Sequence, residues 1–453
     1  VRQVALEFHL RPLHPRRADD EAETLGQLEL IEDLAHLAAL LLILLVGAIG
    51  ACSENLDTGK GCPLLCAGQS ITVRDTVITP ALAFDSTFVG FPQRGADSGI
   101  LLAWRGDTIE TRGVVRFDSM LTAFAPPNDT IRLVSHVDSS MLKLVFAAAG
   151  RRLPSKVTFD IYDVDESSDT NSAAVLANFV ASRRIGGKTI DSAAFTDTTY
   201  IPLSDSAVLD KIVNAKHLRV GIKVSGTGSV WLRAGSVETG NAATVSYRPS
   251  PDTLVKALVV NPISSVPLDP AELKRDLQDY TLVSKYNIPA TPGTFAVGGT
   301  PGRRAYLRFN IPRAISDSST VIRATLRLTQ RPVKLGSLRD SMVVHAHVGL
   351  AGPAVTDLYR ASDIISAAGL LVLDSLIVSP SDSGVKSLEM YTLVRAWGGQ
   401  SALVNQPPRA LILKARDEFL TPMEARFFST SGPLATRPSL RVTYVPKSTY
   451  GVP

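Results

Sequence analysis

Two segments of the chain share one alternating pattern, and this repetition constrains the fold more than any other feature of the sequence. The later segment, Ala305–Pro312, reads Ala-Tyr-Leu-Arg-Phe-Asn-Ile-Pro, and the earlier one, Gly113–Met120, reads Gly-Val-Val-Arg-Phe-Asp-Ser-Met. Successive side chains of a β-strand point to opposite faces of a sheet, so Leu307, Phe309 and Ile311 are predicted to face a core together. The chain therefore reads as two copies of one β-domain.

The earlier copy repeats the same two faces. Val115 and Phe117 take the inner positions, and Arg116 and Asp118 take the outer ones. We expect Phe117, like Phe309, to anchor a core rather than to contact a ligand. In the later copy, we expect the side chains of Tyr306, Arg308 and Asn310 to point outward.

Further matches keep the order and spacing of the two copies. Thr87–Val89 reads Thr-Phe-Val and Thr281–Val283 reads Thr-Leu-Val. The first segment begins 29 residues before Arg116, and the second begins 27 residues before Arg308. Matching segments in the same order imply two similar domains.

The two copies also end alike, at Thr244–Tyr247 and Arg441–Tyr444. Short alternating segments, separated by turn residues and without long helical periods, predict an all-β fold of antiparallel β-sandwiches. We expect the first β-sandwich at residues 70–250 and the second at residues 252–453, with the joint in Arg248–Thr253.

An apolar run, Leu34–Ala51, ends directly at Cys52. It is short for a bilayer span and ends in small residues, as a cleavage region does. Ile49-Gly-Ala-Cys52 resembles a bacterial lipobox, which implies a signal over residues 1–51, a lipid on Cys52 and a tether over residues 52–69. An uncleaved membrane anchor is the alternative. Glu29, Glu32 and Asp33 directly precede the apolar run, where a signal usually has a short basic segment, so residues 1–33 are also compatible with a misplaced translation start.

The three cysteines lie together, at positions 52, 62 and 66. With Cys52 acylated, Cys62 and Cys66 form an even pair, and an oxidising envelope compartment favours a disulfide between them. A metal site is the alternative, although three cysteines without a histidine fall short of the usual four zinc ligands.

An acidic turn carries Asp163, Asp165 and Asp169. Closely spaced carboxylates supply the oxygen ligands that calcium prefers, so these residues are candidate calcium ligands. The segment lacks the central glycine and the terminal glutamate spacing of an EF-hand loop, and a solvated acidic turn is the alternative.

Charge and motifs narrow the classes of function. The formal net charge is +4, and the basic residues are scattered rather than clustered, which disfavours nucleic acid as a partner. The sequence has no Gly-x-Ser-x-Gly elbow, no phosphate-binding Gly-x-x-x-x-Gly-Lys loop and no His-Glu-x-x-His pair. We therefore expect no enzyme and no cofactor. A glycoside hydrolase built from dispersed carboxylates stays open as an alternative.

The later copy resembles a DNRLRE-type domain, a jelly-roll β-sandwich of bacterial surface and secreted proteins that is related to carbohydrate-binding modules. The resemblance implies two tandem jelly-roll-like sandwiches, surface structure or glycan binding, and no catalytic residues. It covers about residues 280–447 and is weaker in the earlier copy. The segments that carry it are Tyr306–Pro312, Ile322–Leu328, Tyr391–Trp397, Ala410–Lys414 and Arg437–Tyr444.

Together these features predict a non-catalytic, membrane-anchored envelope lipoprotein that acts as a structural or surface interaction module. Ser53, rather than Asp, follows Cys52, which by resemblance to outer-membrane lipoproteins favours the outer membrane. Polysaccharide or envelope proteins are the expected partners. For a carbohydrate-binding protein, the first alternative, Trp104 is the candidate platform because it precedes Arg-Gly-Asp in an expected loop.

Overall fold

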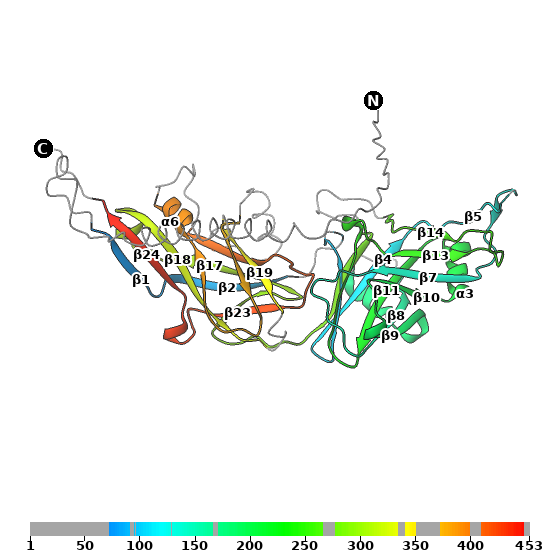
Figure 1. Ribbon diagram of the computed structural model, residues 1–453, viewed down its shortest axis with the longest axis horizontal. Helices are drawn as coiled ribbons and strands as arrows, with labels where there is room; N and C mark the ends of the chain where they lie inside the picture. Colours follow the sequence, from blue (N-terminus) through cyan, green and yellow to red (C-terminus); the bar gives the residue numbers. More distant parts are fainter. Residues whose placement is uncertain are drawn as a thin grey trace, which may run out of the picture. The chain divides into compact units, whose positions relative to one another are not determined.

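Most of the regular structure among the described residues is antiparallel β-sheet (Figure 1). The computed structural model describes residues 72–90, 95, 97–127, 129–165, 171–265, 277–333, 340–349, 372–398 and 409–447. The predicted all-β class is confirmed, and among the described residues every ladder between named strands is antiparallel.

The strands fall into two groups, which we call the first body and the second body. The first body comprises β3 (Ile100–Arg105), β4 (Ile109–Phe117), β5 (Ala123–Phe124), β6 (Arg132–Leu133), β7 (Ser139–Val145), β8 (Lys156–Asp163), β9 (Arg184–Asp191), β10 (Thr198–Pro202), β11 (Leu218–Gly226), β12 (Val230–Ala234), β13 (Thr244–Arg248), β14 (Leu258–Val260) and β15 (Asp279–Tyr286). Its helical turns are α2 (Ser172–Ala177), η1 (Ala181–Arg183), η2 (Ser192–Ala194), α3 (Asp205–Asp210), η3 (Lys211–Ala215) and η4 (Val237–Thr239).

The second body comprises β1 (Arg74–Ile78), β2 (Leu82–Gly90), β16 (Thr294–Gly298), β17 (Gly302–Phe309), β18 (Ser319–Arg331), β19 (Met342–Val348), β20 (Asp374–Val378), β21 (Gly384–Glu389), β22 (Ala410–Ala415), β23 (Glu424–Phe428) and β24 (Ser439–Pro446). Its helical turns are α4 (Arg313–Ser316), α6 (Tyr391–Trp397) and η5 (Leu434–Thr436).

In the first body, two sheets enclose a core. One sheet follows the order β12-β3-β4-β11-β8-β9 with β15 on β4, and the other follows β10-β7-β13-β14. Val115 and Phe117 are fully buried between them, as the alternation predicts. The first body is therefore a β-sandwich.

The second body is one eleven-stranded sheet whose strands contribute to a single core. Leu307, Phe309 and Ile311 lie in that core, as predicted. The ring of Phe309 lies 5.1 Å from that of Trp397 on α6, measured between centroids. Helix α6 therefore contributes to the core through Leu393, Val394 and Trp397.

One outward position of the repeated strand is buried in each copy, whereas Asn310 is exposed as predicted. Arg116 is 1% exposed and Tyr306 is 2% exposed, which corrects the expectation that both face outward. Tyr306 is covered by the rings of Phe84 and Phe88, at 6.3 and 6.2 Å between centroids. The alternating pattern identified the two faces but not the strand that covers the second one.

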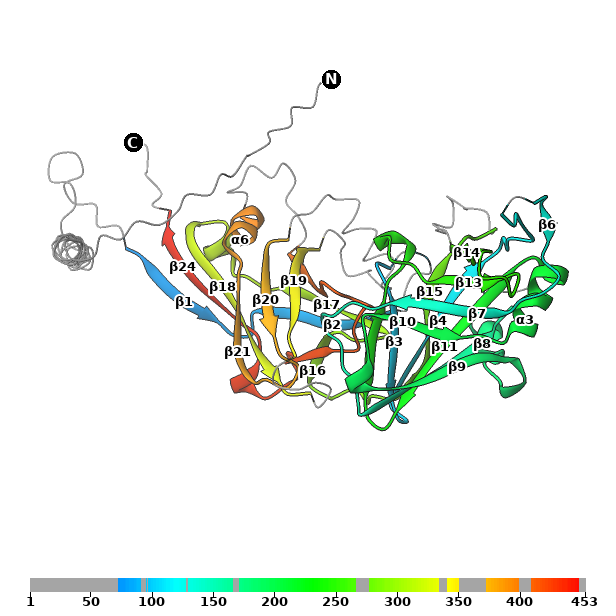
Figure 2. The same cartoon turned by 45° about the vertical axis from the view of Figure 1, so that its right-hand side comes forward.

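That covering strand comes from the other copy. In Figure 2, β2 lies with β17 in the second body, and β15 lies with β4 in the first body. Thr87 is opposite Ala305, and Thr281 is opposite Gly113. Ala305 and Gly113 are both three residues before the matched arginine, so the two exchanged strands pair in the same register.

The strand that precedes each of these is exchanged as well. In the second body β1 pairs with β24, with Thr76 opposite Val442. In the first body β14 pairs with β13, with Val260 opposite Val245. Val245 and Val442 are matching positions of the two copies, so a two-strand unit has been exchanged in each direction.

This exchange changes the domain boundaries expected from the sequence. The first body is continuous, from residue 97 to 286, and the second body joins residues 72–90 to residues 294–447. The expected division into 70–250 and 252–453 therefore assigns both exchanged units to the wrong sheets. The two bodies also share apolar contacts, because Leu101, Ala103 and Trp231 of the first body belong to the core of the second.

Candidate functional site

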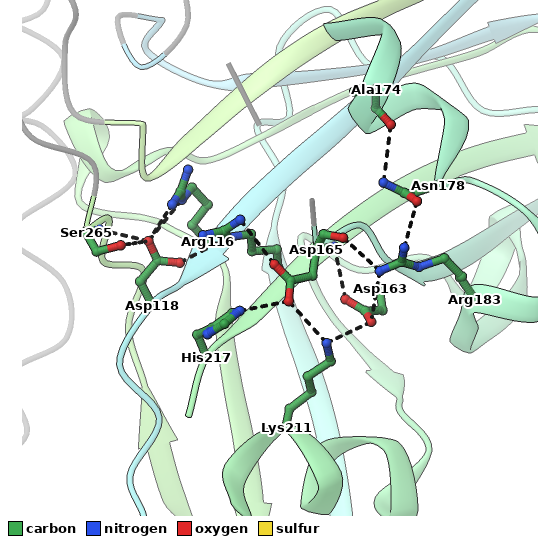
Figure 3. A network of polar contacts seen from close by, with 11 residues as sticks. Arg116, Asp118, Asp163, Asp165, Ala174, Asn178, Arg183, Lys211, His217 and Ser265 are labelled. Carbon is green, nitrogen blue, oxygen red and sulfur yellow. Dashed lines mark hydrogen bonds and ion pairs between the residues drawn. The ribbon is translucent and has the colours of Figure 1, made fainter. Parts of the chain in front are cut away.

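A network of polar contacts surrounds two of the candidate calcium ligands (Figure 3). Asp163 ends β8, and Asp165 follows it two residues later. The Nζ of Lys211 lies 2.9 Å from Oδ2 of Asp163 and 3.4 Å from Oδ2 of Asp165. One lysine therefore bridges the two carboxylates.

Asp165 has two further basic side chains as partners. The Nε2 of His217 lies 2.8 Å from its Oδ2, and the Nη1 of Arg219 lies 3.1 Å from its Oδ1. Burial alone raises the pKa of Asp165, but the hydrogen bond with His217 and the charges of His217, Lys211 and Arg219 lower it overall.

Asp118 lies at the other end of the cluster and connects it to the repeated strand. Arg116 Nη2 is 2.6 Å from its Oδ2, and Arg219 Nε is 3.4 Å from its Oδ1. The backbone N–H and the hydroxyl of Ser265 each donate to Oδ2 at 2.8 Å. Burial favours a higher pKa for Asp118, but the donors from Arg116 and Ser265 lower it overall.

Sheet pairing assembles this cluster from distant parts of the sequence. The ladder between β8 and β11 places Asp163 opposite Val220, so residues 217–219 arrive beside the acidic turn. The π-helical turn η3 begins at Lys211 and is capped by Lys216 in the left-handed region, with φ 59°. The chain then reverses into β11, with Lys211 and His217 beside the same carboxylates.

The cluster is a network of ion pairs in which cations outnumber carboxylates. Arg183 adds a donor at 3.4 Å from Asp163 Oδ2. The oxygens that calcium would need are already bound by N–H donors, and calcium takes six to eight oxygen ligands. These cations oppose binding of a divalent cation at Asp163 and Asp165. Asp169, the third candidate, lies outside the described residues.

Trp104 lies on β3 rather than in the expected loop. It is opposite Val230 of β12 and Glu110 of β4, one residue before the strand ends at Arg105. The ring is half-buried and packs against the core of the first body. Only part of the side chain is therefore available to a ligand.

Carboxylates also gather where β15 joins the first body, a feature that the sequence analysis missed. Burial, as the largest cause, raises the pKa of Asp279 to about 7, although the backbone N–H of Val237 donates to its Oδ2 at 2.9 Å. Burial, with the charges of Glu418, Glu238 and Asp279, raises the pKa of Asp97 to about 7. The residues are far apart in the sequence, and no local motif signals their meeting.

A pocket of about 280 Å³ is lined by residues of both bodies, among them Trp231, Arg233, Arg416 and Asp417. Trp231 is 2% exposed, and its indole N–H has no hydrogen-bond partner among the described residues. Arg416 pairs with Asp417 at 3.1 Å. The polar groups that face this pocket therefore partly satisfy one another.

Two further sets of residues complete the account of candidate ligands. Cys52, Cys62 and Cys66 lie outside the described residues, so the lipidation and disulfide predictions are not addressed by the structure. Within the described ranges, no three His, Cys, Asp or Glu side chains are placed to hold a metal ion. In the same ranges, no helix has the length and apolar character needed to cross a bilayer.

Comparisons with known proteins give little to set beside this geometry. No protein-family model matches the chain, and no curated protein matches it. Among solved structures, the Macrobrachium rosenbergii nodavirus is similar at 10% identity over 85% of this chain and 94% of that one, with a TM-score of 0.16. The infectious bursal disease virus VP2 subviral particle aligns at 10% identity over 84% and 78% of the two chains, with a TM-score of 0.14.

A bacterial structure also appears among these similarities. The C-terminal domain of the Streptococcus pyogenes antigen I/II-family protein AspA aligns at 9% identity over 80% of this chain and 91% of that one, with a TM-score of 0.18. TM-scores this low do not establish a common fold.

Proposed function

We propose that the protein is a non-catalytic structural module, anchored to the bacterial envelope by a lipid on Cys52. The observation that carries the structural part is the reciprocal exchange of β1–β2 and β14–β15. Each body is completed by strands from the other copy, and backbone ladders therefore hold the two sandwiches in one unit. Such an arrangement suits a protein that must stay rigid rather than one that opens around a substrate.

The ion pairs of the first body support a structural role over a hydrolytic one. A glycosidase needs one carboxylic acid with a raised pKa and a second carboxylate within reach of the glycosidic bond. Asp118 and Asp165 have lowered pKa values and are held by Arg, Lys and His side chains. Asp279 has a raised pKa but is only 4% exposed, which keeps a polysaccharide away from it. Asp97, whose pKa is also raised to about 7, is partly exposed, and a hydrolase would have to use this carboxyl group.

The anchor is supported by the lipobox-like order of the apolar run, the small residues and Cys52. Cells grown with radiolabelled fatty acid should label the protein, and Cys52→Ala should abolish the label. A Ser53→Ala variant should keep it, as the matched control. Label that persists in Cys52→Ala contradicts the anchor.

Carbohydrate binding is the second candidate function, and the partial exposure of Trp104 supports it. Aromatic rings form the platforms on which sugars stack, and Trp104 is half-buried against the core of the first body. The mature protein should be tested on a glycan array beside Trp104→Ala, with the core residue Trp397→Phe as a control. Selective binding that Trp104→Ala alone removes favours the carbohydrate-binding function. A blank array favours the structural one, and release of reducing ends from any polysaccharide overturns both.

A further inference from the structure

The pocket of about 280 Å³ that Trp231 and Arg233 line is here called the Trp231 pocket. We propose that it binds a small organic carboxylate, whose negative charge pairs with the guanidinium of Arg233. The ligand is a compact acid with one negative charge, such as a sugar acid or a short aliphatic acid. This inference goes beyond the proposed function and does not depend on the lipid anchor.

Arg233 is a cation without an acidic partner in the part of the chain that the structure describes. It lies on β12, opposite Leu101 of β3, and its side chain is half-buried. Among the described residues, none forms an ion pair or a hydrogen bond with its guanidinium. Arg116, Arg219 and Arg304, by contrast, each pair with a carboxylate of the chain. A half-buried guanidinium without a counter-charge offers charge-assisted hydrogen bonds to an anion from solution.

The backbone beside Arg233 makes room for its side chain. Gly99 directly precedes β3, and a Cβ at Gly99 would lie 2.9 Å from Cγ of Arg233 and 2.9 Å from the carbonyl oxygen of Ala234. The glycine therefore lets the aliphatic part of Arg233 lie directly against the backbone. Because this part is packed, less side-chain freedom is lost when the guanidinium binds an anion.

The charged residues that line the Trp231 pocket leave one positive charge over. Arg233 and Arg416 supply two positive charges, and Asp417 supplies one negative charge. Nη2 of Arg416 lies 3.1 Å from Oδ2 of Asp417, which leaves the charge of Arg233. Arg233 also lines a second pocket, of about 230 Å³, whose described lining residues include no Asp or Glu. A ligand with a single negative charge therefore complements the charge of the Trp231 pocket.

The rest of the lining suits a compact ligand with both apolar and polar atoms. It includes the apolar residues Leu101, Met342 and Leu420 and the hydroxyl residues Ser341 and Thr421. The volume lies just below the range of about 300–1,000 Å³ that small-molecule sites occupy. The size of the pocket therefore fits a small acid rather than a large one.

Trp231 provides a second, independent observation that points to a ligand. Its side chain is 2% exposed, and its indole N–H has no acceptor among the described residues. The guanidinium of Arg152 lies 5.0 Å from the centroid of the indole ring. Buried N–H donors are normally hydrogen-bonded, and an oxygen of a bound acid would supply the missing acceptor.

The test follows the indole N–H of Trp231 by NMR. The full-length protein is labelled with nitrogen-15, and its three tryptophans give three indole signals, of which Trp231→Phe removes one. Sodium glucuronate and sodium hexanoate are titrated separately. Glucose and hexanamide, each with NaCl at the same ionic strength, are the uncharged counterparts. We expect a saturable shift of the Trp231 signal with at least one acid and none with the counterparts. The acid that binds shows whether the pocket takes a sugar acid or an aliphatic acid.

Variants then assign the binding to Arg233. Arg233→Gln should weaken the affinity for that acid about tenfold or more, because a charge-assisted hydrogen bond is lost, and Arg233→Lys should restore part of it. Arg327→Gln, the control, changes an exposed arginine of β18 outside the pocket and should leave the affinity unchanged. Urea unfolding checks that each variant is folded. Should Arg233→Gln fail to fold, the comparison is made with Arg233→Lys, which should bind less tightly than wild type.

Each outcome decides for or against the site. Weaker binding in the Arg233 variant, with unchanged binding in Arg327→Gln, supports it. The absence of a saturable shift with either acid, an equal shift with the uncharged counterparts, or undiminished binding by the folded Arg233 variant overturns it.

Discussion

Thr87 lies opposite Ala305 in the ladder between β2 and β17, and its hydroxyl accepts a hydrogen bond from the backbone N–H of Ala296 at 3.0 Å. A residue near the start of the first copy is thereby built into the sheet of the second. The same relationship, reversed, joins Thr281 to Gly113. The stability of each body should therefore depend on strands that the simple division at Arg248–Thr253 gives to the other.

The first consequence concerns fragments. Residues 97–288 contain every strand of the first body, whereas residues 97–250 lack β14 and β15. The longer fragment should unfold cooperatively in urea, and the shorter one should be unfolded or much less stable, because it leaves the face of β4 around Val114 uncovered. Circular dichroism during urea titration measures both. Equal midpoints for the two fragments would show that β15 contributes nothing to the first body.

Phe309 should be among the residues that stabilise the second body most. Its side chain is 4% exposed and lies against Trp397. Phe309→Ala should lower the free energy of unfolding by about 3–5 kcal/mol, the usual cost of truncating a buried phenylalanine. Leu434→Ala is the matched control, since Leu434 is 70% exposed. A Phe309→Ala protein with the same free energy of unfolding as the control would contradict the assigned register of β17.

Asp118 should contribute stability that disappears in acid. Its folded pKa is below the ordinary value, so the unfolded state binds more protons as the pH falls. The contribution is present above about pH 4 and is lost as the pH falls through the folded pKa. Asp118→Asn removes the buried ion pair with Arg116 and should cost about 3–5 kcal/mol at neutral pH.

Urea titrations of wild type and Asp118→Asn at several pH values test this directly. The difference between them should shrink as the pH falls below about 4. Asp107→Asn serves as the control, because the Asp107 side chain is fully exposed. A difference that stays constant with pH would mean that Asp118 acts through its shape and not through its charge.

Asp279 should affect the pH dependence of stability with the opposite sign. Its pKa is raised to about 7, so the folded state keeps a proton that the unfolded state releases near pH 4. Stability should therefore fall as the pH rises between these values, and Asp279→Asn should remove that slope. The variant should gain at most about 4 kcal/mol relative to wild type above pH 7, as a shift of about three pKa units implies. Parallel stability curves for the two proteins would contradict the raised pKa.

Local sequence was sufficient for the strands and their buried faces. Val115, Phe117, Leu307 and Phe309 are buried where a period of two places them. The duplication itself was also visible, because the matched segments keep their spacing. These features depend on alternation within a strand, which a single sequence records.

The exchange could not be read from the same pattern. Thr87–Val89 and Thr281–Val283 pair with the two repeated strands in the same register, so the local pattern does not say which strand each one joins. What selects the partner is tertiary packing, such as Phe84 and Phe88 on Tyr306. The burial of Arg116 was missed for the same reason, because the sequence of a strand does not show that another strand will cover its outer face.

Only the carboxylates of the ion-pair network could be picked out from the sequence. Asp163 and Asp165 stood out as neighbours, and without their partners they indicated a calcium site. Lys211, His217 and Arg219 come from a turn and a strand some fifty residues later, and the β8–β11 ladder brings them to the carboxylates. No spacing rule connects these positions.

One pair of disulfide variants tests the exchange most directly. In the structure Arg112 is opposite Leu282 of β15. If each copy kept its own strand in the same register, Arg112 would instead be opposite Phe88 of β2. Two full-length proteins, both with Cys52, Cys62 and Cys66 replaced by Ser, carry either Arg112→Cys with Leu282→Cys or Arg112→Cys with Phe88→Cys.

After mild oxidation, peptide mapping by mass spectrometry measures which disulfide has formed within one chain. The exchange predicts a link between positions 112 and 282, and none between positions 112 and 88. A link between 112 and 88, with none between 112 and 282, would show that each copy folds with its own strand and would contradict the account.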